Sequence, residues 1–363
     1  METINKQDIW ETQKFLIDCA RDHPKAQIAD YVKHLFQSEF GSGHMITDEE
    51  ASLRYLREEI AGLSEKQKKH PYFFHLCGHF CRINLSAGKE LSPEMINRLF
   101  VASSRGVPKA AWFLFEEKLR LFWELSKGKE SPFPFSAKQV EEYLREYKKG
   151  GYTPVRHSEE YRRTYEPAYR VIRREYGAYV RLYAAMEQCL KEKGSVTVAI
   201  DGNSGAGKTT LAKLLAQIFD CNVFHADDFF LPLEKRTPER LSETGGNMDR
   251  ERFREEICER LSEKKAFSYS PFDCSAMKLS APVEVQPKKI NILEGAYCMH
   301  PELREYYDVK VFLSISPAEQ STRILERNGG FMLRRFLEEW IPMENAYFEE
   351  MKVREVCDLV FSC

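Results

Sequence analysis

Short apolar runs alternate with amphipathic segments through the second half of the chain. Between the runs, apolar residues recur every three or four positions, most clearly in 317–327 and 333–351, as in helices that bury one face. Strands that alternate with helices predict a parallel sheet with helices on both faces. Ligands of such sheets bind at the carboxyl ends of the strands. The runs predicted as buried strands are 196–200, 222–225, 290–293, 309–315 and 359–361.

The first half of the chain shows helical repeats without this alternation. Turn-forming residues separate its predicted helices. The break Lys193-Gly194-Ser195 stands directly before the first predicted strand. We therefore predict a mostly α-helical domain over 1–194 and an α/β domain over 195–363. The predicted helices of the first half are 9–21, 28–36, 48–63, 92–103, 109–126, 137–146 and 176–193.

The loop after the first predicted strand carries a phosphate-binding motif. Residues 202–209 read Gly-Asn-Ser-Gly-Ala-Gly-Lys-Thr, which fits the pattern G-x-x-x-x-G-K-[ST] between a strand and a helix. The glycines let successive N–H groups face one anion, and the helix N-terminus adds positive charge. Lys208 is expected to reach the β- and γ-phosphates of ATP, and the Thr209 hydroxyl to bind Mg²⁺.

This motif predicts a P-loop NTPase sheet. The alternative is a glycine-rich turn that only caps a helix. The predicted nucleotide-binding residues are Gly202, Asn203, Ser204, Gly205, Ala206, Gly207, Lys208, Thr209 and Thr210.

The second predicted strand ends in His225-Ala226-Asp227-Asp228. A carboxylate at this strand end faces the same edge of the sheet as the phosphate loop, where it can accept the proton of an attacking hydroxyl. We therefore predict Asp227 as a general base. The alternative is that Asp227 and Asp228 only cap the following turn.

Four ordered motifs in residues 196–363 resemble one group of kinases. They are the phosphate loop, Asp-Asp-Phe-Phe at 227–230, Gly-Gly-Asn-Met-Asp-Arg at 245–250 and Leu-Glu-Gly-Ala-Tyr at 293–297. This set is similar to the uridine kinase and phosphoribulokinase-like P-loop kinases, which include the nicotinamide riboside kinases. No comparable resemblance marks the N-terminal half.

The resemblance implies roles for several acidic residues. By it, Asp227 is the catalytic base, Asp249 binds sugar hydroxyls of the acceptor, and Glu294 lies near Mg²⁺ and the substrate. The resemblance also implies ATP and Mg²⁺ as the cofactors.

The same resemblance implies a mobile lid. Arg323 and Arg327 correspond to lid arginines that contact phosphate, and Asn328-Gly329-Gly330 would hinge the lid, which continues through Arg334 and Arg335. Phosphoryl transfer needs dispersed positive charge, which Lys208, Mg²⁺ and such a segment would supply. The alternative is that these arginines are solvated residues of a helix surface.

One segment departs from the family pattern. In uridine kinases, an aromatic residue followed by Asp and, a few positions on, a His frames the uracil. Phe272 and Asp273 match the first two, so Phe272 is predicted to contact the acceptor, but Met277 stands where the His is expected. Without this hydrogen-bonding partner, a site loses selectivity for a polar base edge. Uridine is therefore expected to be a poor acceptor.

Together these residues predict an ATP- and Mg²⁺-dependent kinase that phosphorylates a hydroxyl of a small metabolite, such as a nucleoside or another sugar-bearing compound. Two alternatives stay open. An ATP-binding regulatory or sensor protein, with the N-terminal domain as its output module, would need Lys208 and Thr209 but no base at Asp227. A sugar-phosphate kinase would keep the chemistry and change the acceptor.

Composition and charge narrow the expected partners to ATP and a small-molecule acceptor. The 363 residues are 43% hydrophobic and 30% charged, with a formal net charge of −2, so no basic excess predicts binding to nucleic acid or to an acidic membrane. Ten cysteines without a Cys-x-x-Cys pair, a polar start and no apolar run near the ~20 residues that span a bilayer predict a cytoplasmic protein. A homo-oligomer is left open.

Polar clusters mark the N-terminal half. The alternation of His75, Cys77, His79 and Cys81 suggests zinc, but on a helix the histidines and the cysteines fall on opposite faces, so one ion is not expected to collect all four. On a strand all four would share one face, but Gly78 and the neighbouring helices argue against a strand.

Two further segments of this half combine exposed backbone or dense polar side chains. The loop 40–44 and the His-, Tyr- and Arg-rich segment 157–170 suit either a polar or anionic ligand or a contact between domains. Arg82 and Asn84 fit either role.

Overall fold

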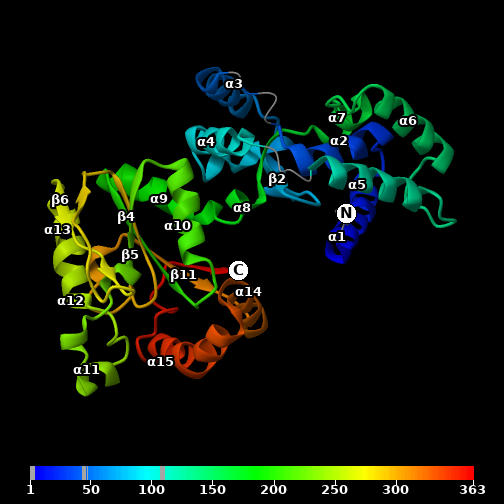
Figure 1. Ribbon diagram of the computed structural model, residues 1–363. Helices are drawn as coiled ribbons and strands as arrows, with labels where there is room; N and C mark the ends of the chain where they lie inside the picture. Colours follow the sequence, from blue (N-terminus) through cyan, green and yellow to red (C-terminus); the bar gives the residue numbers. More distant parts are fainter. Residues whose placement is uncertain (1–4, 43–45, 47, 107–110) are drawn as a thin grey trace. The chain divides into compact units, whose positions relative to one another are not determined.

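The computed structural model describes residues 5–42, 46, 48–106 and 111–363. The chain forms two compact units, Met1–Val180 and Arg181–Cys363, which we call the N-terminal unit and the C-terminal unit (Figure 1). The sequence placed the boundary at 194/195 instead. The difference is α9 (Val180–Lys193), whose Tyr183 is fully buried with its ring 6.2 Å from that of Phe219 in the C-terminal unit.

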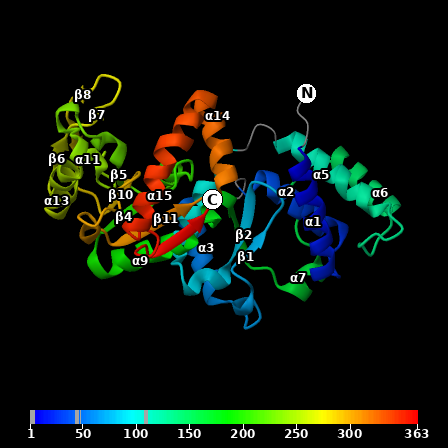
Figure 2. The same cartoon turned by 90° about the horizontal axis from the view of Figure 1, so that it is seen from below.

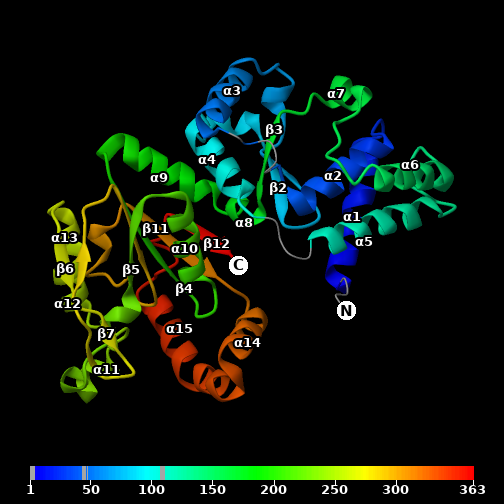
Figure 3. The same ribbon diagram turned by 45° about the horizontal axis from the view of Figure 1, so that its top comes forward.

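The C-terminal unit is built on a five-stranded parallel sheet in the order β12-β11-β4-β10-β5 (Figure 3). Every strand predicted from the sequence is present, and helices flank the sheet. The predicted fold class is therefore confirmed. The strands are β4 (Val196–Gly202), β5 (Cys221–His225), β10 (Ile290–Glu294), β11 (Val309–Ser314) and β12 (Leu359–Ser362).

Alternate strand residues fill two hydrophobic layers, because successive side chains of a strand point to opposite faces. Val198 and Ile200 of β4 face one layer, and α10 (Lys208–Ile218) packs against β4, β5 and β10. Ala199 faces the other layer, which holds one large core cluster. This cluster includes Phe224, Phe229, Phe253, Ile257, Leu293, Phe312 and Tyr347.

Short elements surround the strand ends of this unit. Four brief strands that the sequence did not predict form two antiparallel pairs, β6 with β9 and β7 with β8. The elements are η4 (Ala226–Phe229), η5 (Leu233–Lys235), α11 (Pro238–Ser242), α12 (Arg250–Phe253), η6 (Arg254–Cys258), α13 (Glu259–Ser262), β6 (Phe267–Tyr269), β7 (Phe272–Asp273), β8 (Lys278–Leu279), β9 (Val283–Val285) and η7 (Arg304–Tyr306).

A helical arm lies between β11 and β12 (Figure 2). It consists of α14 (Pro317–Arg335), the π-helical turn η8 (Phe336–Trp340) and α15 (Ile341–Glu350). Gly329 interrupts α14 with φ 77° and ψ 169°, so the helix is broken at the predicted hinge.

The N-terminal unit is mostly helical, as predicted, but it also contains an antiparallel sheet that the sequence did not predict. The sheet has the order β1-β2-β3, with β1 (Phe73–His75), β2 (Phe80–Asn84) and β3 (Tyr169–Arg173). The helices are α1 (Lys6–Asp22), α2 (Ile28–Phe40), α3 (Glu49–Ala61), η2 (Gln67–Lys69), η3 (Leu85–Lys89), α4 (Pro93–Ser104), α5 (Ala111–Ser126), α6 (Ala137–Lys149), α7 (Glu159–Tyr165) and α8 (Arg174–Gly177).

The helical placement of His75 to Cys81 was wrong, because this segment forms the turn between β1 and β2. His75 pairs with Cys81 across the hairpin, and the histidines 75 and 79 are exposed while Cys77 and Cys81 are buried. Among the described residues, no three His, Cys, Asp or Glu side chains are grouped to hold a metal ion.

Asp201, near the end of β4, is fully buried on the layer that contains Tyr347. Its Oδ1 accepts the Gly202 N–H at 2.7 Å, and its Oδ2 accepts the Met299 N–H at 3.0 Å and the Tyr347 hydroxyl at 2.8 Å. Burial raises the pKa of Asp201 to about 6, against the opposing attraction of Lys208 and these hydrogen bonds. The Asp201 side chain therefore connects the sheet to α15, and the free-energy cost of burying its charged form depends on pH.

The first prediction concerns this pH dependence. Because the folded-state pKa of Asp201 is raised, its contribution to stability is complete below its unfolded pKa and is lost as the pH rises through about 6. Asp201→Asn cannot ionise. The stability of the wild type relative to this variant should therefore fall by on the order of 3 kcal/mol between about pH 4 and pH 8. Denaturant titration of both proteins across this range measures the difference; a difference that stays constant with pH contradicts the assignment.

The second prediction concerns α9. A fragment of residues 178–363 should fold with a higher melting temperature than a fragment of 195–363, because the shorter one loses the buried Leu182, Tyr183 and Met186. Thermal unfolding of both fragments by circular dichroism measures the effect. Equal melting temperatures would place α9 outside the C-terminal unit.

Candidate functional site

The phosphate loop leaves β4 at Gly202, where the backbone passes close to β11. Gly202 has φ +141°, and a Cβ at this position would lie 2.0 Å from the Leu313 carbonyl oxygen. The loop then enters α10 through Gly207, whose φ of +95° is left-handed. The first N–H groups of α10, from Lys208 on, have no carbonyl partner within the helix. The loop therefore presents backbone donors at the carboxyl edge of the sheet.

Lys208 lies over this loop. Its Nζ donates to the carbonyl oxygens of Gly202 at 2.7 Å and Asn203 at 3.2 Å. These contacts place the ammonium group on the concave side of the loop, where an anion would sit.

A chain of hydrogen bonds joins three strand and helix ends beside the loop. Thr209 Oγ1 donates to Glu294 Oε1 at 3.0 Å, and His225 Nδ1 donates to the same oxygen at 2.5 Å. Glu294 and His225 are neighbours across β10 and β5, and Glu294 is only 4% exposed. The hydrogen bond to Glu294 raises the pKa of His225. The structure thus brings the two predicted metal-binding residues, Thr209 and Glu294, into direct contact.

Asp227 and Asp228 follow β5 in η4. The Asp227 side chain is accessible to solvent, but the surrounding protein partly desolvates its carboxylate. This desolvation and the negative charge of Glu294 raise the pKa of Asp227. The positive charges of Lys208 and Arg327 oppose the shift. Desolvation also raises the pKa of Asp228, whose neighbours are His225 and Tyr269. The charge of Lys208 opposes the shift at Asp227, and both acidic residues follow the carboxyl end of β5.

Asp249 is held inside the protein. It is 1% exposed, its Oδ1 accepts the Arg252 N–H at 3.3 Å at the start of α12, and its Oδ2 accepts Lys235 Nζ at 2.9 Å. Each oxygen therefore accepts one hydrogen bond from within the protein. The predicted acceptor-binding role of Asp249 stays a prediction.

Phe272 lies in the β7–β8 hairpin, which packs against η4. Its side chain is 5% exposed, and Met277 turns the hairpin with φ +51°. Arg252 donates to the Ser270 carbonyl at 2.7 Å just before β7. The structure thus places Phe272 next to the element that carries Asp227.

The two predicted lid arginines lie on α14. Arg323 donates to Glu319 at 2.9 Å and, at 3.4 Å, to the Gly205 carbonyl of the phosphate loop. Arg327 donates to Asn328 at 2.7 Å, and its charge acts on Asp227. Both arginines therefore belong to the surroundings of the loop.

Five residues that no motif marked contact these groups. His225 directly precedes the acidic pair and could have been found by its place at a strand end. Gln320, Glu344 and Tyr347 bind Ser204 and Asp201 from the helical arm, 116 to 146 residues away along the chain. Asp201 precedes the loop.

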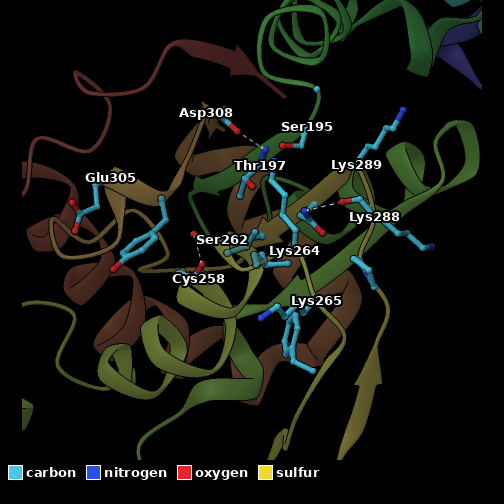
Figure 4. A pocket seen from close by; sticks show the side chains of 17 residues that line it. Ser195, Thr197, Cys258, Ser262, Lys264, Lys265, Lys288, Lys289, Glu305 and Asp308 are labelled. Carbon is cyan, nitrogen blue, oxygen red and sulfur yellow. Dashed lines mark hydrogen bonds between the residues drawn. The ribbon is translucent and has the colours of Figure 1, made fainter.

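The cavity drawn in Figure 4, of about 440 Å³, does not belong to this site. Thr197, Asn291 and Asp308 line it at or beside the starts of β4, β10 and β11, so it lies at the amino edge of the sheet. The phosphate loop lies at the opposite edge. Four lysines also line this cavity, namely Lys264, Lys265, Lys288 and Lys289.

The polar cluster of the N-terminal half forms an internal network. His157 binds Asp30 through Nδ1 at 2.7 Å and Tyr169 through Nε2 at 2.9 Å. Arg82 donates to Gln37 at 3.0 Å and lies 4.0 Å from the centre of the Tyr169 ring. The Arg82, His157 and Asp30 side chains are buried, so these groups bind one another within the unit.

Other N-terminal candidates are placed less centrally. Asn84 donates to the Pro71 carbonyl. Of the predicted loop 40–44, Gly43 and His44 lie outside the described residues. In the part of the chain that the structure describes, no helix is both long enough and apolar enough to cross a membrane.

Comparisons with known proteins gave structural likenesses only. No model of a protein family matches this chain, and no curated protein matches it. A possible uridine kinase from Bacillus stearothermophilus is similar at 22% identity over 50% of this chain and 99% of that chain, with a TM-score of 0.38. A candidate fructose transport system kinase from Silicibacter sp. TM1040 is similar at 24% identity over 46% and 89%, also with a TM-score of 0.38. Both likenesses cover about half of this chain.

Proposed function

We propose that this protein is an ATP- and Mg²⁺-dependent kinase that transfers the γ-phosphate to a hydroxyl of a small metabolite. One observation carries the proposal. A glycine-rich loop with Lys208, a Thr209–Glu294 pair and the solvent-accessible Asp227 meet at the carboxyl edge of one parallel sheet. This is the arrangement that phosphoryl transfer needs, because the reaction depends on positioning and charge stabilisation.

The loop and Lys208 would hold the phosphates of ATP. The N–H groups at the start of α10 can donate to phosphate oxygens, and the helix end favours negative charge. The Lys208 ammonium, which rests on two carbonyl oxygens of the loop, can turn to the β- and γ-phosphates without leaving the site.

The donor set beside the loop fits Mg²⁺. Thr209 Oγ1 and Glu294 Oε1 lie 3.0 Å apart, and hydroxyl and carboxylate oxygens are the ligands that this ion prefers. Thr209 and Glu294 would hold this ion, which would supply positive charge to balance that of the phosphates. His225 holds the Glu294 carboxylate in place through its hydrogen bond.

Asp227 would accept the proton of the acceptor hydroxyl. Its raised pKa makes it a stronger base than an ordinary aspartate. The hairpin with Phe272 lies beside η4, so it would form a wall of the acceptor site. A nucleoside or another sugar-bearing compound is the acceptor class that we propose, with uridine a poor member of it.

The third prediction tests the phosphate loop. Lys208→Ala should leave the fold intact and abolish turnover, because it removes a phosphate-binding cation without changing the core. The measurement is ATP consumption by the full-length protein over a panel of nucleosides, sugars and vitamins that includes uridine, with circular dichroism as the check on folding. Turnover within a few-fold of the wild type would refute the role of the loop.

The fourth prediction separates a kinase from a nucleotide sensor. Asp227→Asn should keep the affinity for Mg·ATP and lose about 10²–10⁴-fold in phosphoryl transfer. Asp228→Asn is the matched control, because Asp228 is the neighbouring residue with the same charge and its own neighbours are His225 and Tyr269; it should keep most of the activity. Isothermal titration calorimetry and the same turnover assay measure the two quantities. Full transfer activity of Asp227→Asn would contradict the role of Asp227 as the base. A wild type that binds Mg·ATP but transfers no phosphoryl group would favour the sensor.

A further inference from the structure

Two helices of the helical arm, α14 and α15, both form hydrogen bonds with one residue of the phosphate loop, Ser204. The Ser204 N–H donates to Glu344 Oε2 at 2.9 Å, and the Ser204 hydroxyl donates to Glu344 Oε1 at 2.5 Å. The Ser204 carbonyl accepts Gln320 Nε2 at 2.9 Å. Gln320 belongs to α14 and Glu344 to α15, so all three polar groups of Ser204 bind the arm.

Both arm residues are buried polar side chains. Gln320 is 5% exposed and Glu344 is 4% exposed. Burying a carboxylate or an amide is costly unless its hydrogen bonds are made. Both side chains make their hydrogen bonds to Ser204. Their burial therefore depends on the loop holding its present conformation.

If these contacts served only to attach the helical arm to the sheet, they could lie at any point along the sheet. Here the contacts converge on the third residue of an eight-residue motif, between Gly202 and Gly207. Arg323, one turn after Gln320, also reaches the Gly205 carbonyl. The next loop residue is thus contacted by the same helix, which also carries the two predicted lid arginines.

We infer that Gln320 and Glu344 are positioning residues that set the conformation, and hence the nucleotide affinity, of the phosphate loop. This inference rests on the proposed nucleotide-binding function. Ser204 contributes by transmitting the position of the arm to the loop, because its N–H and its hydroxyl both donate to Glu344. Through these contacts, the seating of the arm and the binding of nucleotide are linked, and by thermodynamic reciprocity each favours the other.

Charge gives this inference a sharp test. Glu344→Ala removes both acceptors from Ser204. Glu344→Gln keeps both contacts, because its carbonyl oxygen can accept the Ser204 N–H and its amide can donate to the Ser204 hydroxyl. The glutamine also removes a negative charge beside the place where phosphates bind, which lowers electrostatic repulsion. The two variants should therefore move the nucleotide affinity in different ways.

The experiment is calorimetric titration of the full-length protein with Mg·ADP, with thermal unfolding measured without nucleotide. Glu344→Ala should weaken the Kd about 10- to 100-fold, as expected for the loss of hydrogen bonds to a charged group. Glu344→Gln should bind as tightly as the wild type or more tightly. The matched control, Glu349→Ala, removes an exposed carboxylate from the same helix and should leave the Kd unchanged.

Two milder variants keep the test decisive if Glu344→Ala does not fold. Ser204→Ala and Gln320→Ala each remove one contact and should each weaken the Kd roughly threefold to tenfold. A merely structural role would lower the melting temperature of these variants and leave the Kd unchanged. Folded variants that all bind Mg·ADP within twofold of the wild type overturn the inference and leave the proposed function standing. A wild type that does not bind Mg·ADP overturns both.

Discussion

The close approach of Gly202 to β11 sets the position of every other group in the site. A side chain at this position would collide with the Leu313 carbonyl, so the backbone can turn out of the sheet only where Cβ is absent. From that point the loop reaches the N-terminus of α10, which lies beside the ends of β5 and β10. Lys208, Thr209, Glu294 and His225 meet because these three elements end together. The chemistry of the site is thus a consequence of one steric constraint on the backbone.

Negative charge dominates the protein groups around the loop. Asp201, Asp227 and Glu294 lie near the single ammonium of Lys208, and burial or mutual repulsion raises the pKa of two of them, Asp201 and Asp227. Such a cluster is more stable when further cations enter it. This imbalance is what a site for a metal ion and a mobile arginine would require, and Arg323 and Arg327 stand on the adjacent helix. The electrostatics and the proposed cofactors therefore agree.

The parts predicted well from the sequence were those with local signals. The five strands of the parallel sheet were found because each is a short run built around apolar residues between helical segments, and the phosphate loop because its residues are consecutive. The hairpin of β1 and β2 was missed because Gly78 and the neighbouring helical segments argue against a strand, and because the polar Arg82 falls inside β2, where it is buried against Tyr169. Gln320 and Glu344 were missed for another reason: they look like ordinary polar residues of a helix surface, and only the tertiary fold brings them to Ser204. Contacts between residues so far apart in the sequence produce no periodic pattern of apolar and polar residues from which they could be predicted.

The buried network around His157 gives the N-terminal unit its own response to acid. Burial lowers the pKa of His157 to about 3, and burial also holds the pKa of His34 well below its ordinary value. As the pH falls below about 6.5, these two histidines take up protons in the unfolded chain but stay neutral in the folded unit. The free energy of unfolding of this unit therefore decreases in acid. Asp201 in the C-terminal unit has the opposite sign, since it is favoured in its protonated form. Mild acidification would therefore have opposite effects on the stability of the two units. It would destabilise the N-terminal unit and would stabilise the C-terminal unit, where protonation removes the buried charge of Asp201 beside the phosphate loop.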